Sequence, residues 1–544
     1  MKPSTLRIGR RYRPTRLADR YDAVVIGSGM GGLTVAALLS ELGQRVCVLE
    51  QHYTAGGYTH SYERNGYEWD VGVHYIGDVG APTRTRKMFD FLSSGTLQWA
   101  PMDEEYDRFF VGDKVFCAKA GREAFRDNLI EQFPEEVDAI DRYLALLRQV
   151  GSGLSAFTMG RMLAPWQKTL ASPLLKWKTP SVMFRNTYEV LSELTENPDL
   201  IATLCGQWGD MGLPPKQSAF MVHAMIARHY LYGGFYPVGG SWRIAESVIP
   251  RIQAGGGEVF TYARVDEIVV SGQHVSGVRM ADGHVIECST VISSAGVLNT
   301  FAHLLNPDVA AGMGYDRKLD SVSPSFAHLG VYIGLKGSAE ELKLPKTNFW
   351  IYPSNDYDAD VERFVADREA EFPVVYISFP SAKDPDYASR HPGTSTIEIV
   401  APAPYEWFAQ WEEKTWGKRG EDYETFKAAL GERLMAHLYD KLPHLKGKVD
   451  YYEVSTPLST NWFAGYQKGE LYGLAHSSER LKQDWLRPQT PIKGLWLTGQ
   501  DILTCGVTGA MMSGLMTTTA MMGPRRMTPL MKQIFGAEAQ PAPN

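Results

Sequence analysis

A glycine-rich turn near the N-terminus constrains the fold more than any other feature of this sequence. In residues 21–50 an apolar run is followed by GSGMGG, then by an Ala/Leu-rich helical period, and then by a second apolar run that ends at Glu50. Gly27, Gly29 and Gly32 have the spacing G-x-G-x-x-G, whose glycines allow a tight turn, a close approach to pyrophosphate and close helix–strand packing. The stretch predicts a β-α-β unit that binds a dinucleotide at the helix N-terminus.

Glu50 strengthens this prediction. It ends the second predicted strand, 18 residues after Gly32, where a carboxylate accepts hydrogen bonds from an adenosine ribose. The same negative charge disfavours a ribose that carries a 2′-phosphate. The alternative, an incidental surface glutamate beside an ordinary glycine turn, does not account for the combined spacing.

A glycine doublet, Gly56–Gly57, follows six residues past this acid. Together these segments resemble the extended FAD signature of the amine-oxidase and phytoene-desaturase superfamily. The resemblance implies FAD as the cofactor, with the doublet beside its phosphate and ribityl groups. The chain has no second glycine fingerprint, so either NAD(P)H binds transiently as the reductant or another reductant supplies the flavin.

Further segments resemble one branch of that superfamily, the retinol saturases and plant carotenoid isomerases. They lie in collinear order between residue 22 and about residue 523 and read DVGVHYIGD, GDMGLPPKQSAFMVHAMIARHYLYGGFYPVGG, STPLST, KGELYGLAHS and LRPQTPIKGLWLTGQDILTCGVTGA. The resemblance implies an α/β fold, in which a Rossmann-like, doubly wound FAD-binding domain carries an α+β substrate domain and a helical cap. The chain departs from animal retinol saturases at its N-terminus, which lacks their endoplasmic-reticulum signal, and this puts retinol itself in doubt.

The resemblance also implies an activity. We expect an FAD-dependent oxidoreductase that saturates a carbon–carbon double bond of a hydrophobic polyene, such as a retinoid, a carotenoid or a related lipid, by hydride transfer from reduced flavin. The same site would serve a redox-neutral cis–trans isomerase or a desaturase. A flavoprotein that binds lipid without turnover is the non-enzymatic alternative.

The cofactor residues that the resemblance implies lie in both halves of the chain. In LTGQDILTCGVTGA, Asp501 would hold the ribityl or phosphate end of FAD, and the helix after Gly506 would approach the pyrimidine side of the ring. Cys505 has no neighbouring cysteine or base and is predicted to be a small packing residue. The full set is Gly27, Ser28, Gly29, Gly31, Gly32, Glu50, Gln51, Gly56, Gly57, Tyr58, Val265, Ala295, Gly499, Asp501, Val507 and Thr508.

Candidates for the proton donor are few. His74 and Tyr75 lie in DVGVHYIG, which in relatives runs back toward the flavin, and His229 precedes the specific LYGGFYPVGG run. A buried histidine with a satisfied partner is the commoner explanation for residues of this kind. His60 is expected to hold its loop and Asp70 to orient backbone. Close sets of His, Cys and carboxylate residues are lacking, so no metal site is predicted.

The net charge and the cysteine content limit the partners and the cellular compartment that we expect for the protein. The formal net charge is −7, which argues against a nucleic-acid partner because phosphate binding requires a clustered basic excess. The five cysteines show no C-x-x-C spacing, which favours a reducing compartment, and the basic N-terminus has no apolar signal core. We therefore expect a cytoplasmic protein.

Residues 161–186 interleave tryptophan and leucine with lysine and arginine, so these residues are either short interfacial segments on a membrane or a buried cap with a basic outer face.

The chain divides into a discontinuous cofactor domain and inserted substrate regions. The predicted divisions are a basic arm at 1–20, an FAD-binding domain at 21–102, 236–300 and 489–524, a helical cap or substrate region at 103–235, a substrate-binding domain at 301–488 and a C-terminal tail at 525–544. Within the substrate-binding domain, the apolar runs at 326–335, 374–379 and 395–400 predict strands, and residues 423–442 predict a helix.

Overall fold

A six-stranded parallel sheet forms the base of the molecule in the computed structural model, which describes residues 6–536. The apolar runs on either side of the glycine turn form two central strands that are buried along their whole length, because both faces of the sheet are covered. In spatial order the strands are β1 (Arg10–Arg11), β10 (Glu258–Thr261), β3 (Val46–Leu49), β2 (Ala23–Ile26), β14 (Val291–Ser293) and β20 (Leu495–Leu497).

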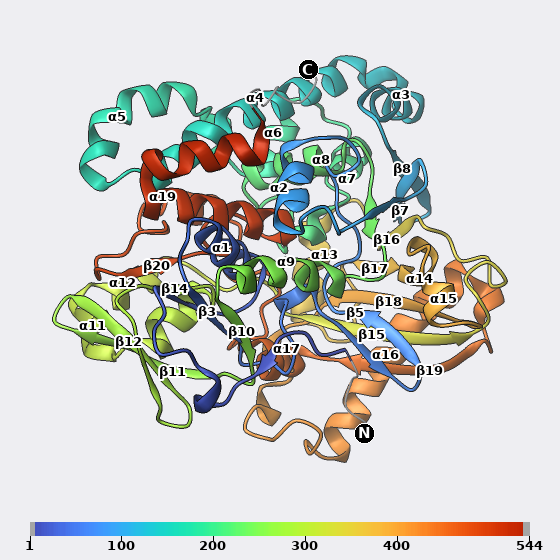
Figure 1. The fold of residues 1–544 in the computed structure, drawn as a ribbon. Coiled ribbons are helices and arrows are strands. Elements are labelled where there is room, and N and C mark those ends of the chain that lie inside the picture. Colours follow the sequence, from blue (N-terminus) through green and yellow to red (C-terminus); the bar gives the residue numbers. More distant parts are fainter. Residues whose placement is uncertain (1–5, 537–544) are drawn as a thin grey trace.

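Helix α1 (Met30–Glu41) lies on this sheet and is buried at every residue from Met30 to Ser40. It contacts α9 (Trp242–Ala254) and α19 (Gly506–Phe535), and α2 (Arg84–Leu92) packs beside them (Figure 1). A Cβ on Gly514 of α19 would lie 2.6 Å from Cβ of Thr34, so glycine permits this close packing of the two helices. The predicted doubly wound domain is therefore present.

The two ends of the chain differ from the prediction. The predicted tail at 525–544 is helical as far as Phe535, because α19 bends at Gly523 and buries Met527, Leu530, Ile534 and Phe535 at helical spacing. The predicted free arm at 1–20 pairs with the edge of the sheet through β1, where the Tyr12 amide donates to the carbonyl of Thr261 at 2.9 Å. Residues 1–5 and 537–544 lie outside the described residues.

A seven-stranded sheet forms the second layer of strands. Its pairs are antiparallel except β16 with β7. The strands predicted at 326–335, 374–379 and 395–400 are present, and α16 (Glu421–Lys441), predicted at 423–442, packs on one face. The spatial order is β19 (Val449–Ser455), β15 (His328–Lys336), β18 (Thr394–Pro402), β17 (Val375–Ser378), β16 (Asn348–Tyr352), β7 (Glu105–Val111) and β8 (Lys114–Lys119).

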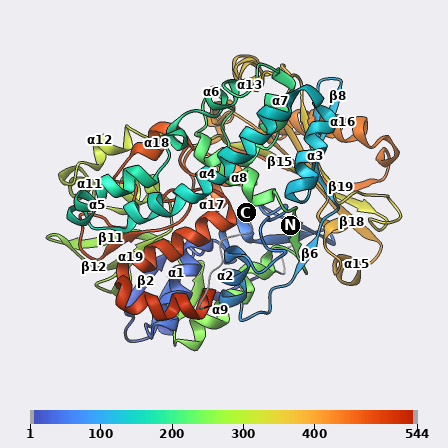
Figure 2. The same cartoon turned by 90° about the horizontal axis from the view of Figure 1, so that it is seen from above.

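Residues 105–119 therefore belong to this sheet and not to the predicted helical cap. From Asp107 to Val111 the side chains of β7 alternate between buried and partly accessible, the period of two that a strand requires. The cap begins at residue 122 and covers the other face of the sheet, where its apolar side chains share a core with Trp350 and Tyr376 (Figure 2). Its helices are α3 (Arg122–Gln132), α4 (Val137–Met162), α5 (Pro165–Lys178), α6 (Thr187–Ser192), α7 (Pro198–Leu204) and α8 (Phe220–Tyr230).

Helix α5 lies at the periphery and packs on α4. The side chains of Trp166 and Trp177 are 66% and 80% exposed, and Leu170 and Leu174 are exposed as well. Pro165 begins this helix and Pro180 follows its end, whereas Pro173 lies inside it. Among residues 6–536 no helix is both long and apolar enough to cross a membrane.

Smaller elements connect these layers. Residues 301–319, predicted in the substrate domain, pack instead against Val24 and Ile26 of the six-stranded sheet through Phe301 and Tyr315. The smaller strands are β4 (Ser61–Arg64), β5 (Tyr67–Asp70), β6 (Trp99–Pro101), β9 (Phe235–Pro237), β11 (Val265–Ser271), β12 (His274–Met280) and β13 (Val285–Glu287). The remaining helices are α10 (Val297–Asn299), α11 (Pro307–Gly312), α12 (Tyr315–Leu319), α13 (Tyr357–Ala366), α14 (Pro380–Lys383), α15 (Tyr387–Arg390), α17 (Pro457–Ala464) and α18 (Ser478–Lys482).

Candidate active site

The carboxyl ends of the parallel strands bring predicted cofactor residues together from distant parts of the chain. Gly27 follows β2, Glu50 follows β3, Ala295 follows β14 and Gly499 follows β20. Ligands of open α/β sheets bind in the crevice outside these ends. A cavity of 1270 Å³ lies there, and all four residues line it.

The glycine turn has the geometry that a dinucleotide requires. Gly27 has a φ of 94°, a conformation that L side chains rarely adopt. A Cβ on Gly32 would lie 2.2 Å from the carbonyl oxygen of Gly27, and one on Gly31 would lie 2.7 Å from Cα of Gly499. Gly29 instead faces open space and lines the cavity, so a ligand can approach the backbone at the N-terminus of α1.

The Glu50 carboxylate lines the same cavity although its residue is only 8% exposed. One oxygen accepts from the amide and hydroxyl of Ser28 at 2.9 and 2.7 Å, and the other accepts from the His52 amide at 2.8 Å. The Ser28 hydroxyl in turn accepts from the Gly56 amide at 3.0 Å. Because a carboxylate offers about four acceptor sites, one remains for a ribose hydroxyl. Glu50 thus also ties the first glycine turn to the second.

The second turn packs directly on the first. A Cβ on Gly57, whose φ is 56°, would lie 2.9 Å from Cα of Gly29. The Nδ1 atom of His60 lies 2.6 Å from the Gly57 carbonyl oxygen, so His60 holds the turn, and burial lowers the pKa of its imidazole to about 3. Tyr58, next in the chain, stacks parallel to Tyr466 with ring centroids 6.2 Å apart. Gln51 lines the cavity beside this turn, and Val265 lines it at the start of β11.

A second helix N-terminus faces the cavity. Gly506, Val507 and Thr508 open α19 and all three line the cavity. The buried hydroxyl of Thr508 has no hydrogen-bond partner among the described residues, although buried hydroxyls are normally paired. The unpaired amides and the dipole of this helix favour negative charge at the same place. The Thr508 hydroxyl and the amides at the start of α19 therefore fit a ligand whose neighbouring part is polar.

Asp501 does not take the position predicted for it. Its carboxylate is buried away from the cavity lining and accepts from the Val297 amide at 2.7 Å and the Leu474 amide at 2.8 Å. Both oxygens are thus engaged by backbone, and the residue joins α10, the loop before α18 and the C-terminal segment. The prediction that Asp501 contacts the cofactor is corrected to a role in holding these three segments together.

Cys505 lies at the N-cap of α19, where its amide donates to Nε2 of His476 at 2.9 Å. Its thiol donates to the carbonyl oxygen of Asp210 at 3.2 Å. Burial raises the pKa of this thiol to about 12, so it carries no thiolate at neutral pH. The geometry is that of a packing residue, as the sequence predicts.

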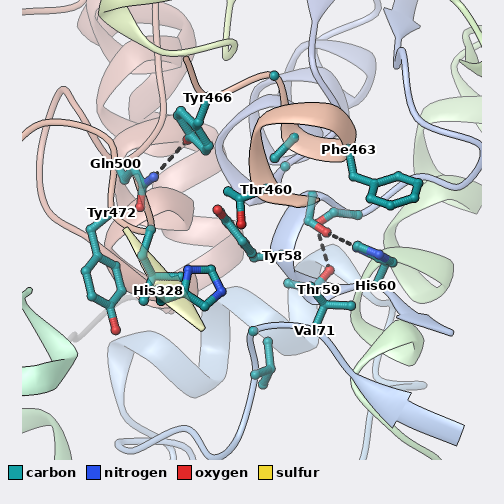
Figure 3. Close-up of a pocket in the computed structure, with 18 of the residues that line it drawn as sticks. Tyr58, Thr59, His60, Val71, His328, Thr460, Phe463, Tyr466, Tyr472 and Gln500 are labelled. Carbon is teal, nitrogen blue, oxygen red and sulfur yellow. Dashed lines mark hydrogen bonds between the residues drawn. The ribbon is translucent and has the colours of Figure 1, made fainter. Parts of the chain in front are cut away.

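The cavity continues past both turns into an aromatic chamber between the seven-stranded sheet and the helical cap. Figure 3 shows Tyr58, Tyr466, Tyr472 and His328 around its middle section. His328 opens β15, and its buried Nδ1 atom has no partner among the described residues. The chamber beyond is lined by Tyr75, Trp208, Tyr230, Trp350 and Tyr376.

His74 lines this chamber and pairs with Glu398, whose Oε2 atom lies 2.9 Å from Nδ1. Burial, with the nearby charge of Lys383, lowers the pKa of His74 to about 3. Burial raises the pKa of the Glu398 carboxyl well above its ordinary range and lowers that of Lys383 to about 7. The imidazole is therefore neutral at neutral pH.

His229 and Tyr75 also line the chamber. Nε2 of His229 accepts from the Gly77 amide at 2.8 Å, and burial lowers the pKa of this imidazole to about 4. This bond holds the segment that carries His74 and Tyr75. Tyr75 stacks on Tyr230 with ring centroids 4.1 Å apart and points its hydroxyl at two carboxylates that were not predicted.

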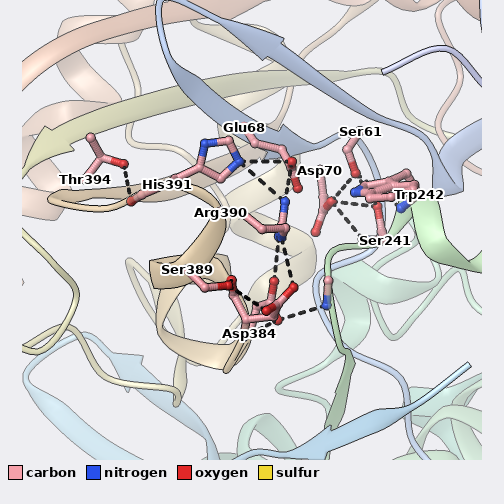
Figure 4. A network of polar contacts seen from close by, with 12 residues as sticks. Ser61, Glu68, Asp70, Ser241, Trp242, Asp384, Ser389, Arg390, His391 and Thr394 are labelled. Carbon is pink, nitrogen blue, oxygen red and sulfur yellow. Dashed lines mark hydrogen bonds and ion pairs between the residues drawn. The ribbon is translucent and has the colours of Figure 1, made fainter. Parts of the chain in front are cut away.

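Asp70 belongs to a buried network beside the chamber (Figure 4). One of its oxygens accepts from the Ser61 hydroxyl at 2.5 Å and from the Ser241 hydroxyl and amide at 2.7 and 3.1 Å, the orienting role that the sequence suggests.

Nearby, ligand atoms of Glu63, Glu68 and His391 lie close enough to share a cation. Arg390 donates to Glu68 at 2.6 Å, however, and its positive charge disfavours a metal ion there.

Four ionisable residues near the chamber escaped the sequence reasoning. Glu398 and Lys383 lie behind His74, whereas Asp107 and Asp210 flank the Tyr75 hydroxyl. The available signal was a charged residue within an otherwise apolar run, as in STIEIV around Glu398. Nothing local identifies their partners, which are distant in sequence.

Ser28 and Gly32 support the turn from behind, and the other predicted cofactor residues except Asp501 line the cavity. Two glycine turns, an acid placed for a ribose and two helix N-termini together fit a dinucleotide cofactor.

Comparison with known proteins agrees with this site. A family model described as an NAD(P)-binding Rossmann-like domain matches residues 25–92. Among solved structures, the cyclohexylamine oxidase of Brevibacterium oxydans superposes with a TM-score of 0.59 at 14% identity, covering 94% of this chain and 99% of that one. At this identity the likeness concerns the fold alone.

Two curated relatives match over most of their length. A chloroplastic prolycopene isomerase of Daucus carota is 25% identical over 517 residues, which cover 91% of this chain and 79% of the relative. The all-trans-retinol 13,14-reductase of Homo sapiens is 38% identical over 535 residues, which cover 94% of this chain and 87% of the relative. The chain belongs to the all-trans-retinol 13,14-reductase family of oxidoreductases.

Proposed function

We propose that this protein is an FAD-dependent oxidoreductase that saturates a carbon–carbon double bond of a hydrophobic polyene, a retinoid, carotenoid or related isoprenoid lipid. One observation carries the proposal: a single cavity runs from the paired glycine turns into an aromatic chamber. Its 1270 Å³ exceed the roughly 300–1,000 Å³ of an ordinary ligand pocket, so a dinucleotide and a second ligand can share it.

We assign FAD to the cofactor section, the part of the cavity that is lined by the two glycine turns, Glu50 and the start of α19. Gly29 and the N-terminus of α1 would face the pyrophosphate, and Glu50 would hold the adenosine ribose. Val507 and the unpaired hydroxyl of Thr508 would face the ring at the start of α19, where the helix dipole favours negative charge. When bound, FAD in its reduced form supplies a hydride to one carbon of the alkene.

The aromatic chamber suits a flat, water-insoluble substrate. Trp208, Tyr230, Trp350 and Tyr376 offer ring faces and edges against which a conjugated chain can lie. A chamber of this kind also keeps water from the reduced flavin during hydride transfer. The human relative is named for the reduction of all-trans-retinol, which supports a polyene as the substrate class.

A reduction assay under anaerobic conditions tests the proposal. We expect reduced, flavin-loaded protein to convert all-trans-retinol or a carotenoid into a product heavier by two hydrogen atoms while the flavin absorbance returns to that of the oxidised form. A product of unchanged mass with an altered double-bond geometry would indicate the isomerase, and a product lighter by two hydrogens the desaturase. A purified protein that takes up no flavin would overturn the proposal. Parallel reduction with NADPH, NADH and dithionite identifies the class of electron donor.

We further infer that the protein works in a reducing compartment, at the surface of a membrane. The five cysteines are free thiols, which is typical of cytoplasmic proteins. Helix α5 presents Trp166, Leu170, Leu174 and Trp177 beside the exposed Lys176 and Lys178, the composition of an interfacial helix on an anionic bilayer. A substrate dissolved in the bilayer would be available at such a surface.

A further inference from the structure

Two carboxyl groups face one hydroxyl at the wall of the aromatic chamber. Asp210 ends the short turn Trp208–Asp210 and lines the cavity, whereas Asp107 lies on β7, fully buried behind it. The Tyr75 hydroxyl lies 3.0 Å from Oδ2 of Asp107 and 3.3 Å from Oδ2 of Asp210. A hydroxyl has one proton to donate, so it serves one of the two carboxyls at a time.

Hydrogen bonds decide which carboxyl carries the negative charge. Asp107 accepts from the side-chain amides of Asn348 at 2.9 Å and Gln207 at 2.7 Å, and the Asn348 carbonyl oxygen accepts from Lys383. These donors oppose the effect of burial, which raises the pKa of Asp107. The carboxyl of Asp210 has Tyr75 as its donor among the described side chains, and burial together with the charge of Asp107 raises its pKa to about 8. Asp210 is thus the carboxyl that holds a proton at neutral pH.

Asp210 also lies where the cofactor section meets the chamber. Its carbonyl oxygen accepts from the thiol of Cys505, which directly precedes α19. The first residues of α19 line the cofactor section. Two residues after Asp210, a Cβ on Gly212 would lie 2.9 Å from the ring of Tyr472, which stands in the middle section of the cavity. A polyene that reaches from the chamber toward the flavin site would therefore pass the Asp210 carboxyl.

We propose that Asp210 donates the proton that completes saturation of the substrate double bond, and that Tyr75 and Asp107 position it. The inference rests on the proposed function. Reduced flavin, when bound, would supply a hydride, and with it two electrons, for the new C–H bond at one alkene carbon. The π electron pair takes the proton from the Asp210 O–H at the neighbouring carbon, and the Asp210 carboxylate recovers a proton from water once the product leaves.

The other candidate donors are poorer acids. Burial lowers the pKa of His74 to about 3 and that of His229 and His328 to about 4, so each ring is neutral and its N–H is a very weak acid. Burial raises the pKa of the Tyr75 phenol well above its ordinary value. A carboxylic acid matched to neutral pH is the better general acid.

The first test is a single turnover with Asp210→Asn. Reduced, flavin-loaded variant should bind flavin and polyene as the wild type does, yet pass hydride to the polyene about 10²–10⁴-fold more slowly, the usual contribution of a general acid. Asp78→Asn is the matched control, because Asp78 has a pKa raised by burial, does not line the cavity and has a positive φ that asparagine tolerates. It should turn over at the wild-type rate.

The second test is the pH dependence of that turnover, which separates proton donation from mere packing. The wild-type rate should fall as the pH rises through about 8, because Asp210 loses its proton there. Asp107→Asn removes the neighbouring charge and should move the fall to lower pH, whereas Tyr75→Phe removes the donor to the carboxylate and should move it to higher pH.

The outcomes separate the two proposals. If Asp210→Asn turns over within about threefold of the wild type, or if the fall in rate persists in it, the donor assignment is wrong while the proposed function stands. If wild-type protein with reduced flavin transfers hydride to no polyene, the proposed function fails and the donor assignment fails with it.

Discussion

Two acids that look alike in the sequence have different roles at the level of single residues. Glu50 and Asp501 each lie just after an apolar strand, and each was predicted to bind the cofactor. Only Glu50 lines the cavity, whereas the Asp501 carboxylate is buried against the amides of Val297 and Leu474, outside the cavity lining. These partners lie far away along the chain, so the local sequence does not distinguish a ligand from a structural acceptor.

Asp501→Ala should therefore destabilise the fold. The substitution leaves two buried amides without an acceptor, and each such group costs about 1–3 kcal/mol, so we expect the free energy of unfolding to fall by about 2–6 kcal/mol. Denaturant unfolding of the flavin-free protein measures this loss. Asp320→Ala, at an exposed acid, should change stability by less than about 0.5 kcal/mol. Unchanged stability of the Asp501 variant, together with weaker flavin binding, would restore the original prediction.

Glu50→Gln should act on the cofactor. The change keeps the shape of the side chain but removes the charge that faces three protein donors and would also accept from a ribose hydroxyl, so we expect the Kd for FAD to rise at least about tenfold. Fluorescence titration of flavin-free protein measures it. Glu41→Gln, at the exposed end of α1, is the control and should bind FAD normally. Equal affinity in the two variants would contradict the ribose role.

At the level of elements, α5 stands out because its large apolar side chains are exposed and its packing on α4 does not explain them. It packs on α4 and leaves both tryptophans and two leucines exposed at the periphery (Figure 1). We expect the wild-type protein to sediment with vesicles of anionic phospholipid, and Trp166→Ser with Trp177→Ser to reduce the bound fraction at least about tenfold, because each buried aromatic ring contributes more than about 1 kcal/mol.

Trp462→Ser provides the matched control for that experiment. Trp462 is half exposed on α17, outside α5, and its replacement should leave vesicle binding unchanged. High salt should weaken the wild-type interaction as well, because Lys176 and Lys178 would be attracted to the lipid head groups. Wild-type protein that stays entirely in the supernatant at low salt would remove the membrane proposal.

The sequence predicted elements well where their hydrophobic period was long and uninterrupted. The β-α-β unit, the strands at 326–335 and 395–400 and the helix at 423–442 are all present. It failed at residues 105–119, where β7 and β8 are joined to the seven-stranded sheet by pairing with β16, more than 200 residues away. It also failed at 525–535, where four apolar residues become a buried helical face only because α2 and α19 lie together.

At the level of the whole molecule, one cavity depends on segments from both ends of the chain. Gly27 to Tyr58 form one wall, and Gly499 to Thr508 complete the cofactor section. Motif spacing was enough to predict which residues of the two glycine turns line the cavity, because each of these positions depends on a short stretch with a fixed backbone shape. The catalytic end could not be predicted in the same way, since the Asp107, Tyr75 and Asp210 cluster is assembled from three separate elements.

A cofactor held by both ends of the chain should stabilise them together. Removing FAD should increase amide hydrogen exchange in residues 27–32, 50–58 and 499–508 at once, while α13, which does not line the cavity, keeps its protection. Restoring FAD to about 100 times its Kd should raise the free energy of unfolding by about 2.7 kcal/mol, because the ligand binds the folded state alone. Exchange mass spectrometry and thermal unfolding at graded FAD concentrations measure both effects. A loss of protection confined to the N-terminal segments would mean that α19 takes no part in holding the cofactor, and the site would then have to be assigned to the first two glycine turns alone.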